Sequence, residues 1–214
     1  MNCPLILQPP VNSSSLSFLT LRAPRYLLRD SFVYNPGAGS VIPYTEGMDR
    51  LFLDFSAKKL RECCARIETC LGMLTAEQVW ARGGENENAV GNLVLHLSGN
   101  VGQWIVSDAG GRADARDRDG EFAATGGLAP AELAERLRAV VEEAAVVLSA
   151  VTRQRLEERI VLQGYGVTVL EAVYHSVEHF SMHTGQILFI TKMLTGSDLG
   201  FYRHLRKGRG VASA

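Results

Sequence analysis

Apolar residues recur every three or four positions over most of the chain from Met48 onward, which is the spacing of one buried helix face. Four long segments carry this pattern, and each predicts an amphipathic helix: residues 49–73, 89–107, 129–151 and 167–195. The segment 158–166 is too short for such a helix and predicts extended structure. We therefore expect an all-α fold, a four-helix bundle spanning residues 48–206.

Residues with capping chemistry stand at the ends of these segments. Thr75 and Gln78 have the spacing of a capping box, which predicts a short helix through Trp80. Asn88 is a candidate N-cap for the segment 89–107. Gly196 is expected to end the last helix, since glycine readily adopts the left-handed conformation found there.

One connection is much longer than the others. Residues 108–127, DAGGRADARDRDGEFAATGG, mix both charges and end in two glycines, and they predict a long crossover loop. A loop of this length in a compact domain is usually either functional or a solvated connection. Both interpretations stay open: the rim of a pocket, or a simple linker.

The two ends of the chain lack the helical pattern. Residues 1–47 hold six of the seven prolines and a run of three serines, which predicts a poorly ordered extension, with Met48 as a candidate natural start. Residues 207–214 predict a flexible tail.

Composition and charge exclude several classes of protein. The net charge is −1 and 21% of residues are charged, so no general field attracts the chain to nucleic acid or to an anionic membrane. No uninterrupted apolar run reaches the roughly 18 residues of a membrane span. The four cysteines form no CxxC pair, and we expect them to be reduced, buried thiols rather than a metal site or a disulfide framework. These features predict a cytoplasmic protein.

The histidines carry the candidate chemistry. His175, His179 and His183 are spaced by four residues, so they form one inclined row on the last predicted helix. Apolar neighbours indicate that this row faces the core or its edge. His96 also faces inward, between Leu93 and Leu97 on another predicted helix. An inward histidine combined with an H-x-x-x-H pair on a second helix is a candidate site for a divalent metal. A lone inward histidine is more often a core residue, and an H-x-x-x-H pair alone arises by chance in many helices.

A second zinc pattern overlaps the first. His175-Ser-Val-Glu-His179 matches H-x-x-E-H, the inverted zinc-protease signature, in which Glu178 would be the general base. That site needs a further carboxylate ligand downstream, but Asp198 is the only carboxylate residue after His179. His183 would also have no role in such a site. The protease is therefore the less favoured alternative.

Two stretches resemble a known group of proteins. GNLVLHLSGNVGQWI (91–105) and VYHSVEHFSMHTGQILFITKMLTGSDLGFYRHL (173–205) together resemble the DinB/YfiT-like superfamily of metal-dependent enzymes, in an uncharacterised branch. The resemblance covers residues 48–206 but not the extension. It implies a DinB-like four-helix bundle, often a homodimer, whose ligands correspond to His96, His179 and His183 here. His175, one turn before the pair, would contact the ligands or line the pocket. Glu178 and Gln186 are candidates to orient a ligand histidine through its other ring nitrogen, with a solvated or helix-packing role as the alternative.

The same resemblance implies a function. Three neutral imidazoles leave an ion with an open position, as in catalytic rather than structural zinc sites. Some relatives are thiol S-transferases that use low-molecular-weight thiols such as bacillithiol, mycothiol or glutathione. We therefore expect a divalent ion, zinc before nickel, manganese or iron, and a metal-dependent thiol transferase or hydrolase acting on a small molecule. The alternatives are a non-catalytic bundle stabilised by a structural metal ion, and a plain bundle with core histidines.

Overall fold

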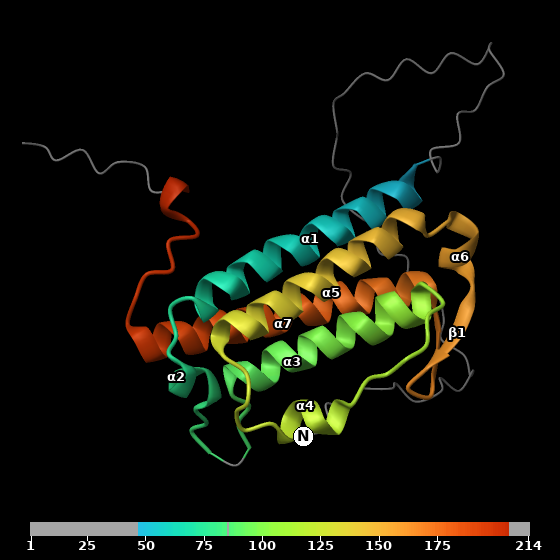
Figure 1. The fold of residues 1–214 in the computed structure, drawn as a ribbon. Helices are drawn as coiled ribbons and strands as arrows, with labels where there is room; N and C mark the ends of the chain where they lie inside the picture. Colours follow the sequence, from blue (N-terminus) through green and yellow to red (C-terminus); the bar gives the residue numbers. More distant parts are fainter. Residues whose placement is uncertain (1–46, 85, 206–214) are drawn as a thin grey trace, which may run out of the picture. The chain divides into compact units, whose positions relative to one another are not determined.

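A computed structural model describes residues 47–84 and 86–205 of the chain. The prediction of an all-α bundle is confirmed, since four long helices pack together (Figure 1): α1 (Met48–Leu71), α3 (Val90–Val101), α5 (Pro130–Ala150) and α7 (Val169–Thr195). Helices α1 and α3 each pack against both α5 and α7. Several predictions concern residues outside the described ranges. These are the tail 207–214, Cys3, and the extension 1–47 except for its last residue. No described helix is both long and apolar enough to cross a bilayer.

Helix directions explain the long crossover. Helix α3 runs antiparallel to α7 but in the same direction as α5, so the chain between α3 and α5 must return along the bundle (Figure 1). This connection is not wholly a loop as predicted, because it contains a short helix, α4 (Arg118–Ala123). The carboxylate of Asp117 caps α4 by accepting a hydrogen bond from the Gly120 amide at 2.9 Å.

The apolar stripes of the four helices meet in one core. Helix α1 contributes residues that are almost fully buried at near-helical spacing, Leu53, Leu60, Ile67 and Leu71, and α7 contributes Phe180 and Ile187. Among the described residues, three cysteines are free and buried, as expected: Cys63, Cys64 and Cys70. Burial raises the pKa of the Cys64 thiol to about 12, so this thiol stays protonated and unreactive at neutral pH.

Local capping chemistry sets most helix ends. The capping box of Thr75 and Gln78 opens α2 (Ala76–Trp80), and Gly196 ends α7 in the left-handed conformation, with φ 63°; both predictions are confirmed. The prediction that Asn88 caps α3 is wrong. The N-cap is Ala89, whose amide donates to Oδ1 of Asn92 at 3.2 Å, so the capping oxygen comes from inside the helix.

The second predicted helix also changes character along its length. From Gly102 it continues as a π-helical segment, η1 (Gly102–Ala109), rather than as the uninterrupted α-helix expected for 89–107. After the short helix α6 (Arg153–Glu157), the segment expected to be extended forms an antiparallel hairpin of β1 (Arg159–Leu162) and β2 (Tyr165–Thr168). The described chain ends in a 3-10 turn, η2 (Arg203–Leu205).

Candidate metal centre

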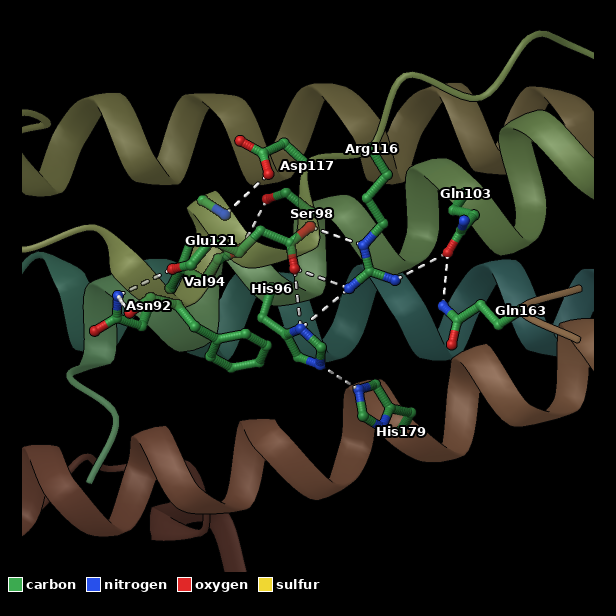
Figure 2. Close-up of polar contacts among 12 residues, drawn as sticks. Asn92, Val94, His96, Ser98, Gln103, Arg116, Asp117, Glu121, Gln163 and His179 are labelled. Carbon is green, nitrogen blue, oxygen red and sulfur yellow. Dashed lines mark hydrogen bonds and ion pairs between the residues drawn. The ribbon is translucent and has the colours of Figure 1, made fainter. Parts of the chain in front are cut away.

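Three histidines from two helices converge inside the bundle. His96 projects from α3, and His179 and His183 project from successive turns of α7. Nε2 of His96 lies 2.8 Å from Nε2 of His179 (Figure 2). One ring nitrogen from each of the three residues falls within 4.8 Å of the other two. The structure therefore brings together the three residues that the sequence analysis singled out, and these residues could hold a metal ion.

A polar contact beside the cluster joins the same two helices. The Ser176 hydroxyl of α7 donates to Oδ1 of Asn100 of α3 at 3.2 Å, and both side chains are buried. This contact lies one turn of each helix away from the histidines. Because the helices are antiparallel, it fixes the register that places His96 opposite His179.

Burial keeps the imidazoles of His179 and His183 neutral. His96 is buried, whereas His179 and His183 are half-buried. Burial lowers the pKa of His179 to about 3, and the nearby imidazoles of His183 and His96 add to the shift. Burial also lowers the pKa of His183, against an opposing effect of its hydrogen bond to Gln186. Neutral imidazoles have a free lone pair, which is the form that binds a metal ion.

A hydrogen bond to Gln186 determines which ring nitrogen of His183 keeps its lone pair. Nδ1 of His183 lies 2.6 Å from Oε1 of Gln186, one turn further along α7. An amide oxygen only accepts, so Nδ1 carries the proton and Nε2 keeps the lone pair. This contact is the one that the sequence analysis proposed for Gln186.

The other two predicted neighbours lie differently. The ring of His175 stacks between Trp104, with centroids 4.1 Å apart, and His179, with centroids 5.4 Å apart. Burial lowers the pKa of His175, while the charge of Glu178 opposes that shift. Glu178 itself is exposed and makes no hydrogen bond to the histidine cluster within the described part of the chain. The geometry thus places His175 beside the cluster and outside the three-nitrogen group, unlike the H-x-x-E-H alternative.

Two charged residues that the sequence analysis missed complete the site. Glu121 of α4 places Oε2 3.0 Å from Nδ1 of His96 (Figure 2). Arg116, from the crossover, binds both carboxylate oxygens, with Nε 2.7 Å from Oε1 and Nη2 2.8 Å from Oε2. Both side chains are less than 10% exposed. Burial acts to raise the pKa of Glu121, but the hydrogen bonds from Arg116 and His96 lower it overall, so the carboxylate is ionised at neutral pH.

A glycine makes room for this pair. A Cβ atom on Gly99 of α3 would fall on the Glu121 carboxylate, and it would lie 2.9 Å from Nε of Arg116. A glycine inside a helical pattern costs about 1 kcal/mol relative to alanine. Gly99, three residues after His96, was therefore a weak sequence signal of close packing at this point of α3.

Arg116 is held in turn from the opposite side. Its Nη1 donates to Oε1 of Gln103 in η1 at 3.1 Å, and Nε2 of Gln163 donates to the same oxygen at 2.8 Å (Figure 2). Gln163 occupies the hairpin turn with φ 50°, a conformation that non-glycine residues rarely adopt. The polar network therefore runs from the hairpin turn to the histidine cluster.

Comparison with known proteins places this chain in a family. Residues 47–206 match the family model described as "Protein of unknown function (DUF1572)". The chain belongs to the DUF1572 family. No curated protein matches the DUF1572 chain.

A solved structure shares its fold. The crystal structure of a conserved protein from Enterococcus faecalis superposes on 67% of the DUF1572 chain and on 96% of its own chain, with a TM-score of 0.56 and 16% sequence identity. At this identity the likeness shows a common fold and carries no information on activity.

The donor set of the DUF1572 chain suits a divalent ion. Nitrogens that share a tetrahedral zinc ion at 2.0–2.1 Å lie about 3.4 Å apart. The three nitrogens lie within 4.8 Å of one another, which is close to this spacing. Imidazole nitrogen is a ligand for zinc, copper, iron and nickel.

Proposed function

We propose that this protein is a divalent-metal protein of the DinB/YfiT-like type, and that it is a metal-dependent enzyme acting on small molecules. The observation that carries the proposal is the convergence of His96, His179 and His183 from two antiparallel helices. The specific motifs H-L-S-G-N and H-x-x-x-H-T-G-Q around these residues support the assignment to this type.

The degree of burial supports a site open to a substrate. His96 is enclosed, but His179 and His183 are half-buried, so the cluster has a protected side and a side nearer to solvent. Three protein ligands leave one position of a tetrahedral ion for another molecule, which is the arrangement of catalytic zinc sites. A structural zinc site would have a fourth protein ligand.

The reaction we favour is transfer of a low-molecular-weight thiol, with hydrolysis next. A divalent ion held by neutral ligands lowers the pKa of a bound thiol or water and so provides a nucleophile at neutral pH. In thiol transfer, the sulfur bonds to an electrophilic carbon of the substrate while the leaving group departs with its electron pair. His175 and Trp104 stack beside the cluster, and we assign them to the wall along which the substrate lies.

The alternative is a metal ion that only links α3 to α7. It is favoured by the fact that the ligands come from two neighbouring helices, so that one ion would join α3 to α7. Thermal stabilisation by the metal without turnover of any thiol and electrophile pair would support this alternative.

Metal analysis followed by activity assays tests the proposal. Full-length protein purified without a histidine tag should contain about one divalent ion per chain. The loaded protein is then assayed with a panel of thiols and electrophiles, and His96→Ala should abolish both metal content and turnover. Wild-type protein that takes up no zinc, nickel, manganese or iron would overturn the proposal.

A further inference from the structure

We propose that Glu121, clamped by Arg116, is a positioning residue that presents Nε2 of His96 to the metal and makes metal affinity depend on docking of the crossover segment. The inference rests on the proposed metal site and deepens it. It concerns residues of α4 and the preceding loop, which lie about 20 to 25 positions from His96 in sequence.

Hydrogen-bond chemistry fixes the proton of His96. Nδ1 of His96 faces Oε2 of Glu121 at 3.0 Å and Nη2 of Arg116 at 3.1 Å. A guanidinium carries only donors and an ionised carboxylate only acceptors, so the carboxylate oxygen accepts from both nitrogens. The proton therefore lies on Nδ1, and the lone pair of His96 lies on Nε2, which points to His179. A carboxylate behind a ligand histidine also raises the basicity of that ligand.

Arg116 compensates the negative charge of the buried Glu121 carboxylate. A lone buried carboxylate would neutralise part of the charge of a bound dication, and it would be costly to bury. The two-point contact of Arg116 with Glu121 supplies a compensating positive charge with both partners less than 10% exposed. The site can thus orient His96 without losing the Lewis acidity of a dication held by neutral ligands.

Two further contacts dock α4 on α3 so that Glu121 reaches His96. Nδ2 of the fully buried Asn92 donates to the Glu121 carbonyl at 3.0 Å and to the Ala124 carbonyl at 2.7 Å. Gly99 provides the space through which the carboxylate passes. The position of Glu121 is therefore determined by buried contacts, and not by a mobile surface side chain.

The test compares two matched glutamate variants of the full-length protein. Glu121→Gln removes the charge of the clamped carboxylate. Glu142→Gln makes the same change in an exposed carboxylate that Arg61 also binds through two nitrogens, between α1 and α5. Zinc dissociation constants are measured by competition with a chelator. We expect Glu121→Gln to weaken zinc binding by about 10- to 100-fold and Glu142→Gln to leave it unchanged.

A second pair of variants tests the same idea without removing a polar group. Gly99→Ala places a methyl group where the Glu121 carboxylate lies, whereas Gly185→Ala places one on α7 where no atom lies within 4 Å. We expect Gly99→Ala to weaken zinc binding and Gly185→Ala to keep the wild-type affinity. These variants still test the inference if Glu121→Gln fails to fold.

A spectroscopic signature separates positioning from general stabilisation. In metal-free wild-type protein at neutral pH, nitrogen-15 NMR should show the His96 ring protonated at Nδ1, and Glu121→Gln should shift the ring toward a mixture of tautomers. Wild-type His96 protonated at Nε2, or unchanged zinc affinity in folded Glu121→Gln and Gly99→Ala, would overturn the inference alone. Failure of the wild type to bind zinc would overturn the proposed function as well.

Discussion

Oε2 of Glu121 lies 3.0 Å from Nδ1 of His96, and this contact joins the crossover segment to the histidine cluster. Glu121 lies in α4, and Arg116 lies in the loop just before it, so the segment that returns the chain between α3 and α5 also forms one wall of the site. The crossover is thus a part of the candidate metal centre.

Metal binding should therefore protect the crossover from proteolysis. The Arg116 side chain is only 4% exposed, so trypsin can cut after it only when the segment undocks. We expect zinc to slow cleavage after Arg116, as followed by mass spectrometry of the fragments. Cleavage after the exposed Arg136 of α5 is the internal control for trypsin activity. Equal cleavage after Arg116 with and without zinc would contradict the coupling.

Single alanine variants should separate the two zinc patterns of α7. His179→Ala and His183→Ala should each abolish stoichiometric metal binding, because each removes one of three ligands. His175→Ala should retain the metal, because its ring lies outside the group of converging nitrogens. Metal content by elemental analysis is the readout. Loss of metal in His175→Ala with retention in His183→Ala would restore the H-x-x-E-H assignment.

Metal removal should lower the melting temperature. An ion that binds the folded chain, with free metal about 100 times above Kd, stabilises it by about 2.7 kcal/mol. For a chain of this size that corresponds to roughly 5–10 °C in Tm. Differential scanning calorimetry before and after chelation measures the shift. An unchanged melting curve after verified metal removal would count against a site that links α3 to α7.

The metal-free protein should lose stability in mild acid. The pKa of His179 is about 3 in the folded chain, and the ordinary value is 6.5. The unfolded chain therefore binds more protons between these values, so the contribution of His179 to stability is fully present above about pH 6.5 and is lost as the pH drops toward 3. The lowered pKa values of His175 and His183 act in the same direction. Urea unfolding over this range gives the curve, and His204→Gln is a control at an exposed histidine. Stability that rises on acidification would contradict this account.

The sequence predicted the parts of the structure that depend on local patterns. The segments 49–73, 129–151 and 167–195 correspond to α1, α5 and α7 within about two residues at each end, because apolar periodicity and capping residues act locally. Asn88 failed as a cap because Asn92 supplies the oxygen that accepts from the Ala89 amide. The change to a π-helix at Gly102 had no recognisable signal in the local pattern.

The three converging histidines were anticipated, but the residues behind them were not. Glu121 and Arg116 lie in a stretch of mixed charge that is as typical of a linker as of a pocket rim, and only their tertiary contact with His96 shows that both are buried. Gly99 marked the place where that stretch crosses α3, but its meaning depends on the neighbouring segment. A single sequence does not show which side chains of distant segments contact one another in the fold.

The most direct test of the central claim is the X-ray absorption spectrum of the zinc-loaded, full-length protein at the zinc edge. We predict a first shell of three imidazole nitrogens at 2.0–2.1 Å together with an oxygen or nitrogen from outside the protein. A shell that contains cysteine sulfur, or one with fewer than three imidazoles, would contradict a site built from His96, His179 and His183.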